Sequence, residues 1–334
     1  MEIKITSNLK SYESKWSEFN IKHPQGNVFQ SPEFFKVYQG TINYEPTVWF
    51  ALDDKDDLCG LLVANKIKQF NKPMEGLSSR SIITGGPLVL DYLHLSKLLN
   101  CYSEENGNKV IFTQVRNLFD KSGEHDIFIN GGYEYEPHLN YLIGLDEIES
   151  AWTNLNKKRR TSIRSAQKKG VTVHELKDGS EIGTFYDLIK ATYKRVKVPL
   201  ADVSLFKSAY KHLDQEKMVK YFFAMHEEKY IGALALLNYK DRAYMWYLGS
   251  LGEYLKYNPN DLLVWESITW AIKNGYKLYD MGGAGHPDEE YGVRKFKSEF
   301  GGDEVNYGRY QIVHSSLKMK ISEMGYKAYR RLKL

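Results

Sequence analysis

The stretch YDMGGAGHPDEEYGVRKFKSEFGG, from Tyr279 to Gly302, places glycines on both sides of a short segment in which aromatic and basic residues alternate. Its first glycines follow an apolar strand pattern, so the backbone there can turn sharply and approach a ligand closely. Arg294, Lys295, Phe296 and Lys297 come soon after this turn. We therefore expect a strand, a turn and a basic helical segment that form part of a binding or catalytic site.

The composition describes a globular chain of 334 residues with 42% hydrophobic residues and a net charge of +4. This length fits two domains of ordinary size. No run approaches about 18 consecutive apolar residues, and MEIKITSNLK lacks the apolar core of a signal peptide, so we expect no transmembrane segment. The expected location is the cytoplasm, either free or at the inner face of the membrane. Cys59 and Cys101 show no zinc-binding spacing, and no metal site is expected.

Two segments of the chain follow the same pattern. VWFALDDKDDLCGLLVA, from Val48, and YFFAMHEEKYIGALAL, from Tyr221, each read as an apolar strand, a charged turn and a second apolar strand. Gly60 and Gly232 occupy matching places near the start of the second strand. Such a pattern predicts a hairpin, and each hairpin follows a helical segment, SPEFFKVYQG or GTFYDLIKATYKRVK. The chain therefore looks duplicated.

The second half continues with the strand AYMWYLGS, the helix NDLLVWESITWAIKNG and the strand YKLYDMGG. Asn260 is the predicted N-cap of that helix, and Gly275 follows its last apolar position. A rougher counterpart in the first half is the helix SKLLNCYSEENG and the strand KVIFTQV. The predicted class is α/β (α+β) with two mixed sheets, divided into residues 1–150 and 151–334.

A hairpin, a strand, a helix and a further strand are the elements of an N-acyltransferase of the GNAT superfamily. Two such units joined through a basic helix resemble the FemABX-like Fem family, whose members add amino acids from aminoacyl-tRNA to the peptide of a peptidoglycan precursor. The resemblance rests on GGPLVLDY, on NKKRRTSIRSAQKKGV, and on YDMGGAG followed by YGVRKFKSEFGG. It implies tandem GNAT-like units, although the coiled-coil arm of some Fem members is absent.

The resemblance also implies catalytic residues. Acyl transfer to an amine passes through a tetrahedral oxyanion, which a fixed cation stabilises. Lys297 stands where the family has a lysine thought to serve this role, and Phe296 would exclude water beside it. The alternative is that the basic residues form a solvated face of a short helix. No histidine or carboxylate stands out as a general base.

Further positions are candidates for substrate binding. Some match family positions, and others flank the glycine turn. The predicted substrate-binding residues are Asp91, Lys36, Tyr247, Asp280, Tyr291 and Arg294. The alternatives remain open, because the two aspartates could simply cap a helix or a turn, the strand tyrosine could belong to the core, and a lone helical lysine is usually exposed.

The basic segment predicts an anion-binding helix. Arg160, Arg164 and Lys168 fall at i, i+4 and i+8, and Lys157 extends the stripe. Like charges at this spacing repel, which favours an anionic partner such as a tRNA acceptor stem, a diphosphate or lipid headgroups. A solvated linker helix is the alternative.

The C-terminal segment has an apolar stripe opposite its basic residues, formed by Leu317, Ile321, Met324, Ala328 and Leu332. A basic amphipathic helix of this kind can contact an anionic membrane surface. We expect instead that the stripe docks on its own domain.

The predicted function is aminoacyl or acyl transfer that forms an amide on a nucleotide- or lipid-linked cell-envelope precursor. The acyl donor is aminoacyl-tRNA or acyl-CoA, with no cofactor. KYNPNDLL weakens the acyl-CoA option, because Pro259 removes a backbone N–H and Asp261 brings a negative charge where a diphosphate would bind. The arginine and tyrosine with which Fem enzymes hold their precursor are not found after ATYKRVKVPLADVSLF, so the acceptor stays open. Alternatives are an acyl-CoA-dependent N- or O-acyltransferase of surface-polysaccharide synthesis, and a non-catalytic module that binds nucleic acid or a nucleotide sugar.

Overall fold

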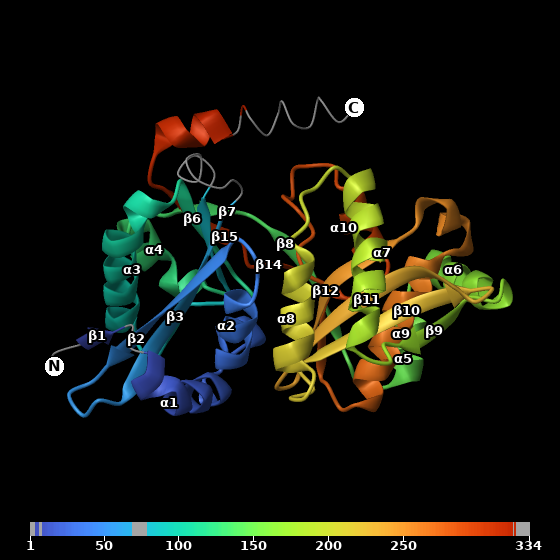
Figure 1. The fold of residues 1–334 in the computed structure, drawn as a ribbon, viewed down its shortest axis with the longest axis horizontal. Helices are drawn as coiled ribbons and strands as arrows, with labels where there is room; N and C mark the ends of the chain where they lie inside the picture. Colours follow the sequence, from blue (N-terminus) through green and yellow to red (C-terminus); the bar gives the residue numbers. More distant parts are fainter. Residues whose placement is uncertain (1–3, 7–8, 69–78, 323, 325–334) are drawn as a thin grey trace. The chain divides into compact units, whose positions relative to one another are not determined.

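The computed structural model describes residues 4–6, 9–68, 79–322 and 324, and it divides into two units (Figure 1). The first unit comprises Met1–Pro137 and Tyr307–Leu334, and the second comprises His138–Asn306. The predicted division into 1–150 and 151–334 is corrected at both ends. The strand after His138 belongs to the second unit, and the chain from Tyr307 returns to the first.

The first unit contains an eight-stranded sheet with the order β1-β2-β3-β4-β6-β15-β7, in which β5 pairs with β3. Its strands are β1 Lys4–Thr6, β2 Tyr44–Leu52, β3 Leu58–Ile67, β4 Arg80–Thr84, β5 Leu88–Val89, β6 Phe112–Arg116, β7 Glu134–Glu136 and β15 Arg309–Val313. Its α-helices are α1 Leu9–Lys22, α2 Pro32–Gln39, α3 Tyr92–Asn106 and α4 His125–Asn130.

The predicted first hairpin is confirmed, and its alternating side chains separate two apolar layers. Leu61 and Val63 of β3 face the cluster formed with α1 and α2, whereas Leu62 and Ala64 face the cluster formed with α3 and α4. This two-residue period is what an extended strand buried on both faces requires. Figure 1 shows α1 and α3 beside the long β2–β3 pair.

The return of the chain to the first unit has a packing reason. β15 pairs antiparallel with both β6 and β7, so it fills a gap in the sheet. Tyr310 of β15 is buried and stacks on Phe128 of α4, with the ring centroids 4.1 Å apart. Sequence reasoning placed this strand in the second unit because chain order alone does not show such a return.

The second unit contains a seven-stranded sheet with the order β14-β8-β13-β12-β11-β10-β9. Its strands are β8 Leu139–Gly144, β9 Thr172–Glu175, β10 Val219–His226, β11 Lys229–Tyr239, β12 Arg242–Ser250, β13 Leu278–Asp280 and β14 Asp303–Asn306. Its α-helices are α5 Ile148–Asn154, α6 Lys157–Lys168, α7 Ile182–Arg195, α8 Val203–Leu213, α9 Pro259–Lys273 and α10 Gly292–Ser298, and the 3-10 helix η6 spans Gly252–Tyr257.

Helices cover both faces of the second sheet. Phe222 of β10 belongs to the buried cluster that includes residues of α5, α6 and α9. Its neighbour Phe223 points to the other face, where its ring centre lies 6.3 Å from that of Phe185 of α7. The second hairpin, β10–β11, is confirmed. The predicted N-cap of α9 is corrected from Asn260 to Asn258, because the helix starts at Pro259, whose fixed φ suits the first turn.

Residues 316–322 form a short helix after β15. Leu317, Ile321 and Met324 are 72%, 45% and 69% exposed, so the expectation that this stripe docks on its own domain is wrong for its described part. Ala328 and Leu332 lie outside the described residues. No helix within the described ranges has both the length and the apolar character that crossing a membrane requires. Within the same ranges no group of His, Cys, Asp and Glu side chains is arranged to hold a metal ion.

Candidate active site in the second unit

The β12–β13 ladder stops early in the sheet of the second unit. These strands pair in parallel only from Arg242–Leu278 to Tyr244–Asp280, although β12 continues to Ser250. In the β11–β12 ladder the register shifts so that Trp246 of β12 forms a bulge. Bulges re-aim side chains and end pairing next to functional sites. The chain after Asp280 is therefore free to form the glycine turn.

The glycine turn needs its glycines at two positions. Gly282 and Gly285 have φ of 71° and 81°, values that residues with a side chain rarely adopt, whereas the φ of Gly283 lies outside this left-handed region. A Cβ at Gly282 would also lie 3.3 Å from the Met245 carbonyl oxygen. The sharp turn expected after the strand is thus present, with left-handed backbone at Gly282 and Gly285 but not at Gly283.

Lys297 of α10 is buried, with 7% of its surface exposed. Its ammonium donates hydrogen bonds to the carbonyl oxygens of Met281, Gly282 and Gly283 at 2.5, 2.9 and 3.0 Å. Burial lowers the pKa of Lys297 to about 8, against the opposing attraction of Asp280. The alternative of a solvated lysine therefore does not hold, and all three ammonium protons are directed at the glycine turn.

Asp280 lies at the end of β13 and is 1% exposed. Its Oδ1 accepts hydrogen bonds from Asn140 Nδ2 at 2.8 Å and from the Gly282 N–H at 2.7 Å. Its Oδ2 is buried without a hydrogen-bond partner in the described part of the chain. Burial raises the pKa of Asp280, while the hydrogen bonds and Lys297 oppose this. Asp280 thus fixes the turn, and sequence reasoning missed Asn140, which no motif distinguishes.

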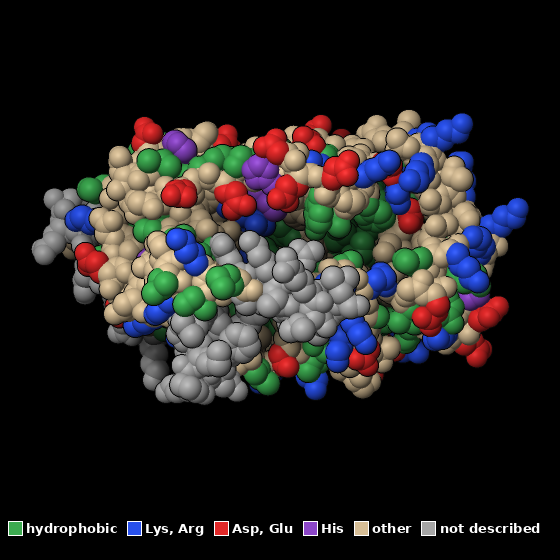
Figure 2. Space-filling model, turned by 90° about the horizontal axis from the view of Figure 1, so that it is seen from above, with side chains coloured by type: hydrophobic (Ala, Val, Ile, Leu, Met, Phe, Trp, Pro, Cys, Tyr) green, Lys and Arg blue, Asp and Glu red, His purple; other side chains and the backbone are tan. Residues whose placement is uncertain are grey.

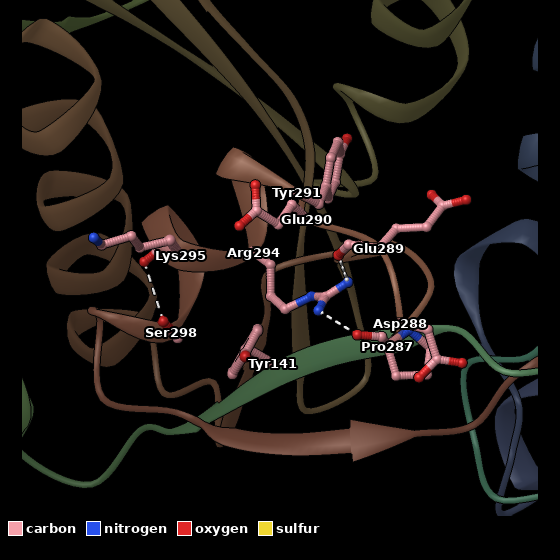
Figure 3. Close-up of a pocket in the computed structure, with 9 residues that line it drawn as sticks. All are labelled: Tyr141, Pro287, Asp288, Glu289, Glu290, Tyr291, Arg294, Lys295 and Ser298. Carbon is pink, nitrogen blue, oxygen red and sulfur yellow. Dashed lines mark hydrogen bonds between the residues drawn. The ribbon is translucent and has the colours of Figure 1, made fainter.

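Arg294 and Tyr291 line one pocket of about 370 Å³ (Figure 3). The guanidinium of Arg294 donates to the carbonyl oxygens of Ala284, Pro287 and Glu289 at 3.2, 2.8 and 2.8 Å, and also to that of His286. It therefore holds the loop that forms the pocket wall. The complete lining is Tyr141, Pro287, Asp288, Glu289, Glu290, Tyr291, Arg294, Lys295 and Ser298.

Arg159 of α6 was missed, although it belongs to the basic run. It is 8% exposed and pairs with two carboxylates, Asp261 in the first turn of α9 and Glu299 after α10. Its Nε donates to Glu299 Oε2 at 2.7 Å. The helical spacing could have indicated its inward direction, because Arg159 lies four and seven residues before Ile163 and Ala166, which face inward. Asp261 is therefore not an unpaired charge at the start of α9.

Phe296 contacts Arg159 as well as the core of the second unit. The Arg159 guanidinium lies 4.7 Å above the centre of its ring, a cation–π arrangement. Phe296 is half-buried and packs against the main cluster of the second unit. Its ring thus supports Arg159, and Phe296 and Glu299 both flank Lys297 in the sequence.

The predicted anion-binding stripe lies on α6, as expected, and its members differ in their contacts. Lys157 and Lys168 are exposed. Arg160 donates to the carbonyl oxygens of Thr153 and Leu155 at 2.8 and 2.5 Å, which fixes the chain that enters the helix. Arg164 lies 5.1 Å above the ring centre of Trp152.

Tyr247 follows the bulge on β12 and is half-buried. Its ring centre lies 4.8 Å from that of Phe206 and 5.8 Å from that of Tyr193. It belongs to an aromatic cluster at the face of the sheet that α7 and α8 cover.

Asp91 and Lys36 belong to the first unit. Asp91 is the N-cap of α3, where its Oδ1 accepts from the His94 N–H at 3.0 Å. Lys36 of α2 pairs with Glu13 at 2.7 Å, and both side chains are about half exposed. Asp91 thus has the structural role that the sequence left open, and no ligand is needed to explain either contact.

Comparison with known proteins adds to this geometry. A family model described as acetyltransferase (GNAT) domain matches residues 157–297. The UDP-N-acetylmuramoylpentapeptide-lysine N(6)-alanyltransferase of Weissella viridescens is 25% identical over 314 residues, which cover 86% of this chain and 88% of that protein.

Two solved structures share the fold. The crystal structure of FemX matches with a TM-score of 0.70 and 16% identity, and the match covers 98% of this chain and 100% of that chain. A tandem GNAT protein from the clavulanic acid biosynthesis pathway matches with a TM-score of 0.56 and 7% identity, over 94% and 99% of the two chains. Together with the matched domain and the alanyltransferase, these structures confirm the resemblance to Fem-like acyltransferases of the GNAT superfamily and the fold of two GNAT-like units.

Proposed function

We propose that the protein transfers an aminoacyl group from aminoacyl-tRNA to an amine of a nucleotide- or lipid-linked cell-envelope precursor. The name of the Weissella viridescens relative describes such a reaction, the alanylation of a lysine in a UDP-linked muramoyl pentapeptide. The relative aligns with most of both chains, so the likeness is not confined to one GNAT unit. Because both kinds of substrate are made in the cytoplasm, we place the reaction there, at the inner face of the membrane where the precursor is lipid-linked.

The observation that carries the choice of acyl donor is the start of α9. Acetyl-CoA enzymes of the superfamily bind a diphosphate at this helix N-terminus, where backbone N–H groups and the helix dipole favour an anion. Here Asp261 occupies the first turn and is 7% exposed, and Arg159 neutralises it from α6. A diphosphate would meet a carboxylate that is already paired. This favours an acyl donor that does not need the coenzyme diphosphate site.

The proposed reaction joins an amine to an ester. The amine nitrogen attacks the ester carbonyl carbon, the carbonyl electron pair moves to oxygen, and a tetrahedral oxyanion forms. Its collapse breaks the bond to the ribose oxygen, which leaves as the hydroxyl of the tRNA end after taking a proton. The amine loses one proton to the substrate or to water, since no side chain is assigned as the base.

We assign Lys297 the role of a fixed positive charge near the oxyanion. Its protons are directed at three carbonyl oxygens, so it acts through its charge and by holding the glycine turn. The low dielectric of a buried site strengthens such a charge. Arg294 is assigned the shaping of the pocket wall, and Tyr291 a substrate contact at that pocket.

A second candidate function has one observation in its favour. The matched family model is described as an acetyltransferase domain, which is consistent with an acyl-CoA donor and with N- or O-acylation in surface-polysaccharide synthesis. The two candidates differ in the acyl donor, and one experiment separates them.

The deciding experiment supplies each acyl donor separately. Purified protein is mixed with a UDP-linked muramoyl pentapeptide and either bulk tRNA charged with radiolabelled amino acids or a panel of radiolabelled acyl-CoAs. We expect label to pass to the peptide from charged tRNA, and this transfer to stop when the tRNA is deacylated. Transfer from acyl-CoA alone would establish the second candidate. Binding of charged tRNA without transfer to any peptide or sugar acceptor would contradict both and favour a non-catalytic module.

A further inference from the structure

The surface around α6 and η6 carries four pairs in which a cation lies over an aromatic ring. The pairs are Arg164 on Trp152, Lys169 on Tyr257, Lys256 on Tyr257, and Lys229 on Tyr254, with distances to the ring centres of 5.1, 5.9, 5.2 and 4.8 Å. We call these residues, together with Lys168, the α6–η6 surface. All of them belong to the second unit. None belongs to the pocket beside α10.

The pairs form one continuous track. Arg164 and Lys168 lie one turn apart on α6, and Lys169 follows the helix end. The Lys169 ammonium donates to the Lys256 carbonyl oxygen at 2.6 Å, which joins the end of α6 to η6. Within η6 the ring centres of Tyr254 and Tyr257 lie 5.8 Å apart. Cations and rings therefore lie close together along the end of α6 and η6.

The charge of this surface is positive. Figure 2 shows blue Lys and Arg side chains gathered at the end of the second unit that carries α6 in Figure 1, with fewer red Asp and Glu side chains beside them. Two carboxylates lie beside the track. Glu253 lies 3.9 Å from the Lys229 ammonium, and Glu227 lies 3.9 Å from Nδ1 of His226, which packs against Tyr257; the two glutamates are 69% and 88% exposed. Ion pairs so long and so exposed stabilise little, and two carboxylates do not balance the five cations of the surface.

The rings are anchored and not merely exposed. Trp152, Tyr254 and Tyr257 are half-buried and pack against the main cluster of the second unit. His226 packs against Tyr257, with the ring centres 4.2 Å apart and the ring planes tilted by 42°. A rigid ring that keeps part of its face accessible can stack on a flat ligand without losing much conformational entropy.

We propose that the α6–η6 surface binds the single-stranded end of an RNA, with unpaired bases stacking on Tyr254 and Tyr257 and phosphates contacting the lysines. The proposal rests on the proposed function, because it names the part of the tRNA that this unit holds. Proteins that bind single strands combine a positive track with aromatic platforms in this way. The outer face of α6 supplies the contacts to the neighbouring duplex phosphates.

A membrane surface fits these residues less well. Lipid-binding helices insert a continuous apolar face. On α6 the apolar residues Ile163 and Ala166 are buried inside the unit, and the outward residues are polar or charged. Leu255 is the one residue of η6 among the large exposed hydrophobic side chains of the described chain. The surface therefore matches a polyanion with flat bases better than a bilayer.

The test compares two RNA hairpins by fluorescence anisotropy at low and moderate salt. Both have the same twelve-base-pair stem, and one carries a four-nucleotide single-stranded 3′ extension, lengths chosen to resemble an acceptor stem and its end. We expect the extended hairpin to bind roughly tenfold more tightly, because stacking favours unpaired bases. Equal binding of the two hairpins, or no binding of either, would overturn the proposal. Stronger binding to vesicles of phosphatidylglycerol and phosphatidylcholine than to RNA would also overturn it.

Variants locate the effect. Tyr254→Leu with Tyr257→Leu keeps the apolar packing and is expected to abolish the preference for the extended hairpin while the stem still binds. Lys169→Gln with Lys256→Gln tests the track without changing the core, and it should weaken both hairpins and reduce the salt dependence. The matched control is Lys207→Gln with Lys211→Gln on α8, which also removes two exposed charges and should change nothing. A preference for the extended hairpin that survives in the leucine variant would refute the stacking.

The outcome is separable from the proposed function. If charged tRNA supports transfer but neither the extension nor the leucine variant changes binding, the surface is wrong and the function stands. If the extension is preferred through Tyr254 and Tyr257 but no acceptor is ever aminoacylated, the surface stands and the function falls.

Discussion

Replacing Lys297 by methionine is the sharpest test of the candidate active site, because its effects on stability and on activity should differ greatly. A shift of the lysine pKa from 10.5 to about 8 means that burial disfavours the charge by about 3 kcal/mol. Methionine removes this cost and fills similar space. The variant also loses charge-assisted hydrogen bonds to three carbonyl oxygens, at about 1.5 kcal/mol each. The two terms nearly cancel, so we expect the free energy of unfolding to change by less than about 2 kcal/mol.

The effect on transfer should be much larger. Removing one preorganised charge from an oxyanion site costs about 100-fold in rate, or about 2.7 kcal/mol. We therefore expect the single-turnover rate of Lys297→Met to fall by about 100-fold or more, with a melting temperature close to that of the wild type. A matched control is Lys273→Met at the exposed end of α9, which also removes one lysine charge from the second unit and should keep its rate.

The pH dependence adds an independent check. Above pH about 8 Lys297 loses its proton in the folded protein, so the transfer rate should fall there. The unfolded chain keeps that proton up to its ordinary pKa of 10.5, so it binds more protons than the folded state between these values. The contribution of Lys297 to the free energy of unfolding therefore rises with pH over this window. Activity and stability should change in opposite directions, and both trends should be absent from the methionine variant.

The assay is single-turnover transfer from charged tRNA over short times, with urea unfolding in parallel. A methionine variant that transfers at the wild-type rate removes Lys297 from the mechanism. A variant that loses activity only in proportion to its loss of folded protein shows that Lys297 is structural. Either result would refute the reasoning above.

Three further predictions concern stability. Arg159→Met leaves the buried Asp261 and the nearly buried Glu299 without their cation. Urea denaturation should show a loss of about 3–5 kcal/mol in the free energy of unfolding, and a loss below about 1 kcal/mol would contradict the burial argument. Gly282→Ala places a side chain at φ 71° and should lower the free energy of unfolding by more than about 1 kcal/mol. Gly183→Ala, in α7 where a Cβ meets no neighbouring atom, should raise it by about 0.5 kcal/mol, and thermal melts of the two variants should shift in opposite directions. Burial lowers the pKa of His314, so the unfolded chain binds this proton before the folded protein does as the pH falls below 6.5. The wild type should therefore lose stability relative to His314→Gln at acidic pH, and a stability difference between the two proteins that does not change with pH would contradict this.

The two hairpins could be predicted from the sequence because their signal is local. Strands with apolar runs and charged turns need no distant partner to be recognised, and both β2–β3 and β10–β11 formed as expected. The strand pairings that cross the predicted boundary could not be predicted. β8 precedes the predicted boundary yet pairs with β13 and β14, and β15 follows it yet pairs with β6. Such pairings depend on long-range packing, which leaves no short-range pattern.

In the candidate site, too, contiguous motifs could be recognised from the sequence, whereas contacts between distant residues could not. Lys297 and the glycine turn could be singled out because the motif is contiguous, and the structure brings them into contact. Arg159 could not be separated from its basic neighbours by charge alone, since its inward direction shows only in phase with Ile163 and Ala166. Asn140 carries no pattern at all, because its contact with Asp280 spans a sequence separation of 140 residues.

The two faces of α6 explain why such a charged helix is stable and why it suits an acyltransferase. Its outward cations repel each other, which costs stability in the free protein. The inward Arg159 compensates by joining α6 to α9 and to the end of α10, next to Lys297. An anion bound outside would relieve the repulsion and so stabilise the same helix that holds α10. The helix that would bind the RNA is thus also the helix that holds the end of α10, on which Lys297 lies. Donor binding and the position of Lys297 therefore depend on one element.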